Sequence, residues 1–528
     1  MLNANLDYAD LSAPASMAGG SVHLGSSTIV PLRHRMLRTV VTESDGFLAV
    51  ATFERFAGDP CGPDHRRAAS DEALLTEARA CRGHALDWSC LTVDRNQRTL
   101  RYESSFLPSA PIYAFAGTAR ATLDWDCSRL LAGLEVQIDW EAAMAHFGGT
   151  AGYSPRTMVR DLRRSTAGAT LVLRPGAIEV RLPEPSRLPG PRRLADGVEP
   201  RELLFNSVKA LIAARPVDRE RTAVDISGGM DSALVSIAAA EALGAGLMST
   251  GAQFRGAMGK AQRGRRRLLC DHGGFDDIDL PADRFAPFSI GSPRRIRFGA
   301  WPQDDTYPEI LETLLSVLER AGIDTLISGF GGDELYAAYE GEGVGGSLPD
   351  EDDAAPYLTD RGRALAAEAV EAYPTGPLQE TSWQAAAGRS QRLLRHGIWP
   401  IYPYHSPELA RFVAALPWEW RRDRRLLRAT LTEKLKNPVF EEDYVKESFR
   451  GVAAKGVTDE RDYLLEVIGR SKLLRPDLVE RDDVLADLAG DPAALPAARF
   501  NALFALLTAC CFFDEGAAAE LPVQASAA

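Results

Sequence analysis

The sequence predicts an α/β protein of two domains, at residues 1–190 and 200–528. Before residue 182, short segments of alternating polar and apolar residues are typical of strands. Four prolines between residues 183 and 191 mark a linker. Near residue 228, an apolar strand then runs into two glycines and a helical pattern. A chain of 528 residues is also too long for one hydrophobic core.

The first domain is expected to consist of strands and hairpins. Residues 1 to about 30 are rich in Ala, Ser and Gly and give only weak signals. Strands are predicted at residues 46–53, 110–115 and 119–123, and hairpins at 88–103 and 169–180, the last with a Pro-Gly turn.

Composition excludes several classes of protein. The net charge of -13 argues against a nucleic-acid partner, because such proteins usually present a basic face. No apolar run approaches the ~20 residues that span a bilayer, and the N-terminus lacks a basic-then-apolar signal layout. We therefore expect a cytoplasmic protein with no membrane partner. Seven cysteines without CxxC spacing fit neither a disulfide framework nor a zinc site, so buried thiols are expected.

The chemistry is expected at Ser227-Gly228-Gly229-Met230-Asp231-Ser232, where the strand ends and the helix begins. Such a turn directs backbone N–H groups and the positive end of a helix dipole at one point. Gly228 and Gly229 have no Cβ that would keep an anion away. The turn is therefore predicted to bind a phosphate, although an ordinary glycine turn is the alternative. The spacing matches neither Gly-x-Gly-x-x-Gly nor a Gly-Lys-Ser/Thr loop.

This segment resembles the PP-loop of the ATP pyrophosphatases, which cleave ATP between its α and β phosphates. The resemblance implies that Ser227, Gly228, Gly229 and Ser232 bind pyrophosphate and that Asp231 binds Mg2+. Together with the preceding hairpins, the loop resembles the asparagine synthetase superfamily. Its fold would be a glutaminase-like (Ntn-type) αββα sandwich followed by a PP-loop α/β domain with a parallel sheet.

The resemblance also assigns roles to two further segments. The strand expected at residues 246–251, with Met248, would lie along the adenine. A second apolar strand ends in Gly329-Phe330-Gly331-Gly332-Asp333. In the superfamily this loop faces the PP-loop across ATP, so Gly329 and Phe330 would contact the nucleotide and Asp333 would share Mg2+ with Asp231. A turn with a helix-capping Asp is the alternative.

Two departures from the superfamily matter. The chain begins Met1-Leu2-Asn3, and its first cysteine is Cys61, so the N-terminal cysteine nucleophile of a working glutaminase is missing. Phe330 stands where relatives carry Glu or a Tyr that belongs to the base, and a phenyl ring takes no proton. Asp304 or Asp305 is then the candidate base or ammonium-binding group, unless both belong to a solvated acidic turn.

Two basic features complete the expected site. Lys446, in a segment that resembles the Lys-Glu-x-Phe sequence of asparagine synthetases, would neutralise the departing pyrophosphate. The alternative is a solvated surface lysine, and Lys455 is the second candidate. Five basic residues between 260 and 267 form either a lip over phosphates or, the reading we favour, a solvated helix face.

The expected function is an ATP-dependent, AMP-forming amide synthetase with ATP and Mg2+ as cofactors. Glutaminase-inactive members of the superfamily include the lasso peptide macrolactam synthetases, which this chain resembles most, and β-lactam synthetases. The substrate would be a peptide or a small amino acid, and a leader peptidase and a precursor-recognition protein are candidate partners. A β-lactam synthetase, another small-molecule amide synthetase and an inactive nucleotide-binding scaffold remain alternatives.

Overall fold

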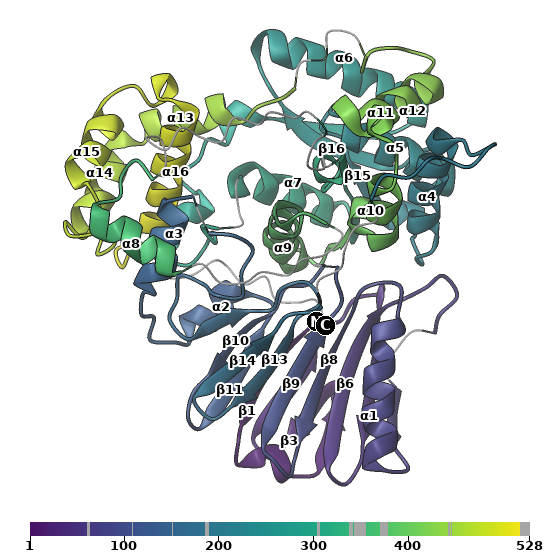
Figure 1. Cartoon of the computed structure of the whole chain (residues 1–528), viewed down its shortest axis with the longest axis vertical. Helices are drawn as coiled ribbons and strands as arrows, with labels where there is room; N and C mark the ends of the chain where they lie inside the picture. Colours follow the sequence, from purple (N-terminus) through teal and green to yellow (C-terminus); the bar gives the residue numbers. More distant parts are fainter. Residues whose placement is uncertain are drawn as a thin grey trace.

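The computed structural model describes residues 1–517 apart from 61–63, 108, 150, 185–189, 304–306, 337–341, 343–354, 370–377, 442–443 and 445. It confirms the α/β class, with two seven-stranded antiparallel sheets and one five-stranded parallel sheet. Figure 1 shows the antiparallel sheets below and the parallel sheet with most of the helices above. None of the helices in the described ranges is long and apolar enough to cross a membrane.

The antiparallel sheets are built from the first 181 residues. The first sheet has the strand order β12 (Leu162–Arg164), β10 (Tyr113–Ala116), β11 (Arg120–Asp124), β1 (Leu2–Asp7), β4 (Ser27–Pro31), β3 (Ser21–Leu24), β2 (Ala15–Ala18). The second has the order β14 (Ala177–Arg181), β13 (Thr170–Arg174), β9 (Thr99–Ser104), β8 (Trp88–Asp94), β6 (Phe47–Glu54), β5 (Leu37–Glu43), β7 (Asp64–Arg67), in which only the β5–β7 pair is parallel.

Most predicted strands of this part are confirmed. The 88–103 hairpin is β8–β9, and the 169–180 hairpin is β13–β14, whose turn contains Gly176 at a φ of +73°. The first 30 residues, for which no strand was predicted, form four strands, β1 to β4. These strands are short and rich in small residues, so they depend on packing against a partner sheet rather than on propensity.

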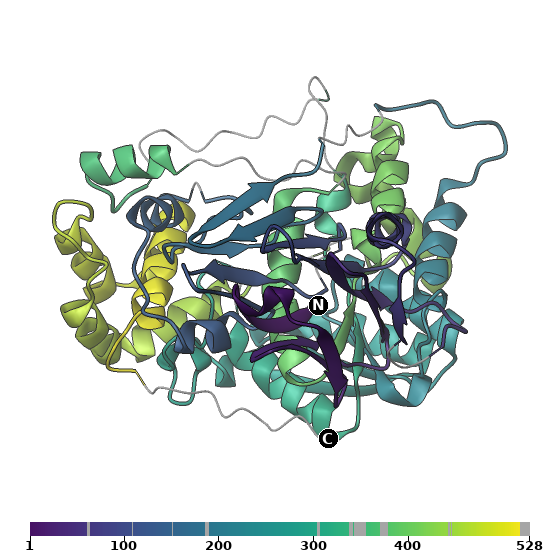
Figure 2. The same ribbon diagram turned by 90° about the horizontal axis from the view of Figure 1, so that it is seen from below.

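The two antiparallel sheets pack face to face. Leu6 of β1 and Val50 of β6 belong to one buried cluster between them. Helix α1 (Asp71–Ala80) packs on the outer face of the second sheet through Leu74, and α2 (Cys127–Ala132) covers the first through Leu130. Viewed from below, this sandwich lies in front of the rest of the molecule (Figure 2).

The parallel sheet has the strand order β17 (Asp276–Pro281), β16 (Met248–Gln253), β15 (Thr222–Asp225), β18 (Thr325–Ile327), β19 (Trp399–Ile401). The chain winds outward from β15 to β17 and then returns to place β18 on the other side of β15. The strand order therefore reverses between β15 and β18. In open α/β sheets, ligands bind outside the carboxyl ends of the strands at such a reversal.

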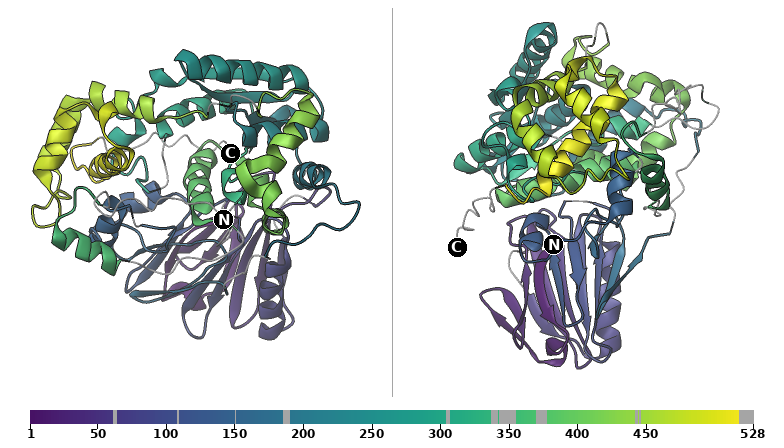
Figure 3. Two further views of the ribbon diagram at one scale, coloured as in Figure 1. Left: turned by 45° about the horizontal axis from the view of Figure 1, so that its top comes forward. Right: turned by 90° about the vertical axis from the view of Figure 1, so that its left-hand side faces the viewer.

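Helices cover both faces of the parallel sheet. The remaining helices are α3 (Trp140–Phe147), α4 (Pro200–Ala213), α5 (Met230–Leu243), α6 (Gly256–Gly273), α7 (Pro308–Arg320), α8 (Asp360–Glu368), α9 (Glu380–Arg395), α10 (Pro407–Ala414), α11 (Trp418–Arg421), α12 (Arg425–Leu435), α13 (Arg450–Asp459), α14 (Arg461–Arg470), α15 (Arg481–Ala489) and α16 (Ala497–Phe512). Leu315 of α7 and Leu393 of α9 pack on one face, and Val208 of α4 and Leu234 of α5 on the other. Helices α13 to α16 gather beside the sheet in a separate bundle (Figure 3).

Buried polar contacts join the sandwich to the parallel sheet. Glu54 at the end of β6 is 1% exposed and accepts hydrogen bonds from Arg215 Nε at 2.6 Å and from Trp399 Nε1 at 2.9 Å. Arg35 Nε donates to both carboxylate oxygens of Asp324, each at 2.8 Å, directly before β18. The sandwich is thus joined to β19 and to the start of β18, the strand that leads into the second glycine loop.

Candidate active site

The first glycine loop, between β15 and α5, is folded by its own hydroxyl groups. Gly229 N donates to Ser227 Oγ at 3.1 Å, and Ser227 N donates to Ser232 Oγ at 3.2 Å. Gly228 has a φ of +88°, which disfavours any residue with a side chain. The N-cap of α5 is Gly229, which provides no side chain to satisfy the first N–H groups of the helix. These N–H groups are the donors that an anion at a helix N-terminus uses.

Helix α6 holds this loop from the side. Gln262 Nε2 donates to Ser227 O at 2.7 Å, and Arg265 Nε donates to Gly228 O at 2.7 Å. Arg265 also forms an ion pair with Glu447 and lies 4.9 Å from the ring centroid of Tyr444. Arg265 therefore connects the loop to the segment that contains Lys446.

The preferred expectation for the basic stretch at residues 260–267 is wrong in part. Arg265 and Arg266 are each 3% exposed in their side chains, and Arg266 pairs with Asp277 at 2.5 Å. Lys260, Arg263 and Arg267 are exposed, as expected of a solvated face. The two buried arginines fall on the side of α6 that faces the loop and the sheet, where Arg265 bonds to a carbonyl and a carboxylate oxygen and Arg266 bonds to a carboxylate oxygen through Nη2.

The second glycine loop follows β18 and comes very close to the N-terminus of α5. A Cβ placed on Gly329 would lie 2.6 Å from both the carbonyl carbon of Asp231 and the backbone N of Ser232. One placed on Gly332 would lie 2.3 Å from Asp231 Oδ1. Real Cβ contacts are not this short. Both positions therefore need glycine, because the two loops meet there.

This approach brings the two predicted metal ligands together around one cation. Arg424 Nη1 donates to Asp231 Oδ2 at 2.9 Å and also to Asp333 Oδ1. Lys446 Nζ donates to Asp333 Oδ2 at 2.8 Å. Glu334 lies close enough to act on the pKa of Asp231 by its charge. The predicted association of Asp231, Asp333 and Lys446 is thus present in the geometry, whereas Arg424 had no signal in the sequence.

The carboxylates of this cluster differ in proton affinity. Burial raises the pKa of Asp231 to about 7, and the charges of Asp333 and Glu334 act in the same direction against that of Arg424. Burial acts to raise the pKa of Asp333 too, but the hydrogen bond from Lys446 and the charge of Arg424 outweigh it and lower that pKa. Two acids whose pKa values are pushed apart in one place are typical of functional sites.

The residues present fit a Mg2+ ion bound together with phosphate. Asp231 Oδ1 is buried and has no hydrogen-bond partner within the described part of the chain. Those residues include no group of three His, Cys, Asp or Glu side chains that could hold a metal by themselves. Mg2+ is usually held by one or two carboxylates and completed by phosphate oxygens and water. Asp231 and Asp333 are such a pair.

Phe330 lies beside a second charged pair at the same edge. The guanidinium of Arg389, on α9, is 4.6 Å from the Phe330 ring centroid and donates to Asp225 Oδ2 at 2.7 Å. Ser328 Oγ donates to the same carboxylate oxygen at 3.2 Å. Asp225 ends β15 and Ser328 follows β18, so the hydrogen bond between Ser328 and Asp225 spans the reversal point of the sheet.

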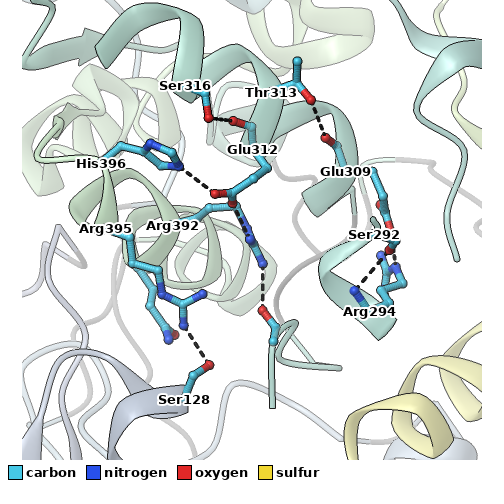
Figure 4. A network of polar contacts seen from close by, with 12 residues as sticks. Ser128, Ser292, Arg294, Glu309, Glu312, Thr313, Ser316, Arg392, Arg395 and His396 are labelled. Atoms are coloured by element: carbon cyan, nitrogen blue, oxygen red, sulfur yellow. Dashed lines mark hydrogen bonds and ion pairs between the residues drawn. The ribbon is translucent and has the colours of Figure 1, made fainter. Parts of the chain in front are cut away.

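A polar network between α7 and α9 fixes the helix that carries Arg389 (Figure 4). His396 bonds to Glu312 and to Glu319 at 2.8 Å each, and Arg392 donates to Glu312 at 2.6 Å. Burial acts to raise the pKa of Glu312, but the hydrogen bond from His396 and the charge of Arg392 lower it to about 2. Burial acts to lower the pKa of His396, but its two glutamate partners raise it.

Not every residue predicted for the site is brought to it. Met248 is the first residue of β16, pairs with Ala223, and packs partly buried against the cluster that contains Leu315. It therefore lies near the amino end of the sheet, away from the loops. Asp304 and Asp305 lie outside the described residues. Lys455 lies on α13, where it pairs with Asp459 four residues on.

A separate cavity surrounds the α-amino group of Met1 in the sandwich. This group donates to Ser89 Oγ at 2.5 Å and to Tyr102 Oη at 3.0 Å, and burial lowers its pKa to about 5. Asp87 also lines the cavity, and burial raises its pKa to about 7. Cys61, the first cysteine of the sequence, lies outside the described residues.

No protein-family model and no curated protein matches the chain.

Proposed function

We propose that the protein is an ATP-dependent, AMP-forming amide synthetase. One observation supports this above all: two glycine-rich loops, at the reversal point of a parallel sheet, bring Asp231 and Asp333 to a single guanidinium beside a helix N-terminus. Such a place suits a triphosphate with its cation, because donors for phosphate and ligands for Mg2+ lie side by side. The resemblance of the loops to the PP-loop family selects ATP and cleavage between its α and β phosphates.

In this proposal the chain's own groups bind and neutralise the pyrophosphate. Ser227, Gly228, Gly229 and Ser232 would surround it together with the first N–H groups of α5, and Lys446 would supply a positive charge. Preorganised charge of this kind is often the largest contribution to catalysis. Mg2+, when bound by Asp231 and Asp333, would neutralise further charge on the phosphates.

The reaction has two steps. A substrate carboxylate attacks the α-phosphorus, the bond from this atom to the oxygen that bridges to the β-phosphate breaks, and pyrophosphate leaves. An amine then attacks the acyl carbon of the adenylate, AMP leaves, and the amine loses a proton as the amide forms. Positioning both reactants replaces a bimolecular encounter. Phe330 and Arg389 border this side and would exclude water from the adenylate.

The most favoured reaction is macrolactam closure of a lasso peptide, in which a peptide N-terminus joins an Asp or Glu side chain. A leader peptidase and a precursor-recognition protein would then act before this step. The sandwich would have a structural role and release no ammonia, because the cavity around Met1 is lined by hydroxyl, carboxyl and apolar groups. Closure of a β-lactam or of another small amide uses the same two steps.

The test compares the wild type with Asp231→Asn by mass spectrometry. Each protein is incubated with Mg-ATP and a peptide-containing extract of the source organism, and nucleotides and peptides are followed together. The proposal expects AMP, pyrophosphate and a peptide that has lost one water, in the wild type alone. AMP with a dehydrated small amino acid would select the β-lactam reaction, whereas ADP, or nucleotide binding without turnover, would refute the synthetase.

Lysine variants sharpen this test. Lys446→Gln should lower AMP formation by roughly 100-fold, the size of effect seen when one electrostatic donor is removed from an active site. Lys455→Gln is the matched control, because that lysine is also exposed and, within the described residues, its ion pair is with Asp459 of its own helix. Equal loss in both variants would contradict the role of Lys446.

A further inference from the structure

Arg424 occupies the position between the two carboxylates of the candidate metal site. Its Nη1 atom donates to Asp231 Oδ2 at 2.9 Å and to Asp333 Oδ1, and its side chain is only 18% exposed. Lys446 takes the second oxygen of Asp333 at 2.8 Å. Three of the four oxygens of the acid pair are therefore engaged by protein cations. A divalent ion that bridges the acids would compete with Arg424 for both of them, whereas Lys446 holds Asp333 alone.

The backbone at Arg424 has an unusual conformation. Asp423 and Arg424 are consecutive non-glycine residues with left-handed φ values of 52° and 54°, directly before α12. Left-handed backbone is unfavourable for residues with a side chain, and such strain persists where the surroundings impose it, often at functional sites. In this segment Arg428 Nε donates to Asp423 O at 2.9 Å, and the two carboxylates hold the guanidinium of Arg424.

A displaced guanidinium would remain beside the phosphates. Asp231 follows the N-terminus of α5, so a group that bonds to it also borders the predicted pyrophosphate position. Guanidinium pairs with phosphate as readily as with carboxylate, through the same parallel N–H donors. The Arg424 side chain can therefore bind the carboxylates in the nucleotide-free protein and the phosphates in the nucleotide-bound protein.

We propose that Arg424 is a resident cation that exchanges partners. It holds Asp231 and Asp333 together in the nucleotide-free protein, competes with a divalent metal for them, and moves to the polyphosphate when the metal-nucleotide complex binds. This inference rests on the proposed function for the identity of the ligand.

The exchange predicts opposite effects on metal and nucleotide affinity. Without nucleotide, Arg424→Gln should bind Mn2+ about tenfold more tightly than wild type. A charge within about 4–6 Å shifts the pKa of a carboxylate by about one unit or more, and we expect an effect of the same size on cation binding. With Mg2+ present, it should bind α,β-methylene-ATP about tenfold more weakly, since charge-assisted hydrogen bonds to phosphate are lost. A purely structural arginine would weaken both.

Electron paramagnetic resonance of free Mn2+ measures the first affinity, and calorimetry with the ATP analogue measures the second. Arg424→Lys keeps the charge and should stay close to wild type in Mn2+ affinity. Arg422→Gln is the matched control, because the side chain of Arg422 is 63% exposed and, in the described part of the chain, its ion pair is with the neighbouring Asp423 alone. Adding Asp231→Asn to Arg424→Gln should abolish the tighter Mn2+ binding, which identifies the site.

Unchanged or weaker Mn2+ binding in a folded Arg424→Gln variant would overturn the inference, as would unchanged binding of the analogue. If that variant does not fold, Arg424→Lys decides the matter, since Mn2+ affinity well above that of wild type would contradict competition by charge. Failure of the wild type to bind the analogue would instead count against the proposed function.

Discussion

Replacement of Gly329 by alanine tests the close contact between the second glycine loop and the start of α5. The added methyl group would lie 2.6 Å from two backbone atoms, the carbonyl carbon of Asp231 and the N of Ser232. Backbone at the start of a buried helix cannot turn aside as a side chain can. The loop after β18 must therefore move away from α5, and Asp333 moves with it.

The expected loss of stability follows from this geometry. Overpacking of a well-packed interior costs about 1–3 kcal/mol, and a clash with backbone falls at the upper end of that range. A loss of about 3 kcal/mol lowers Tm by roughly 6–12 °C in a domain of 150–250 residues, and by less in a longer one. We expect a decrease of about 5 °C, with loss of the Tm increase that Mg-ATP produces in the wild type.

The assay is thermal unfolding with and without Mg-ATP. Gly469→Ala, in α14, is the control, because its added Cβ meets no atom within 4 Å. This control should raise stability by about 0.5–1 kcal/mol, since glycine in a helix is less favourable than alanine. A Gly329→Ala protein with the wild-type Tm and the wild-type response to Mg-ATP would refute the reasoning.

Other contacts make further predictions. Arg265→Met should lower the free energy of unfolding by about 3–5 kcal/mol in urea, because it leaves Glu447 without its buried partner. An unchanged urea midpoint would show that this ion pair contributes nothing to stability. The raised pKa of His396 means that its ion pairs stabilise fully below pH ~6.5 and less as pH rises through the folded pKa, so His396→Gln should flatten this decline. The pKa of Glu312, lowered to about 2 from 4.5, means stability lost as pH falls between these values; Glu312→Gln should remove at most about 3 kcal/mol of that acid dependence in pH-dependent unfolding.

The two loops could be predicted from the sequence because their signals are local. A strand, its glycines and its acid lie within about ten residues, and the steric need for glycine acts at that range. The groups that hold the loops come from far away: Gln262 lies 35 residues from Ser227, and Arg424 lies 193 residues from Asp231. Their residue types are common on helix surfaces, so only the tertiary arrangement distinguishes them.

Strand β16 also shows that local signals predict an element but not its place in the fold. The sequence predicted a strand at residues 246–251, and β16 spans Met248–Gln253. Which of its residues reaches the loops depends on register, and Met248 pairs with Ala223 while Thr250 pairs with Asp225. Register is set by partner strands and not by the strand alone. Position 248 was therefore predicted two residues too early to lie level with the end of β15.

The buried carboxylate of Glu54 constrains how the protein can evolve. It joins a strand of the sandwich to Arg215 and to Trp399 of the parallel sheet, and one hydrophobic cluster continues through both parts. A gene shortened to residues 200–528 would encode a protein with an exposed apolar base and two side chains deprived of their acid. Selection would remove such a deletion even if the sandwich catalysed no reaction. A domain without an activity of its own can therefore be retained because the other domain needs it to stay folded.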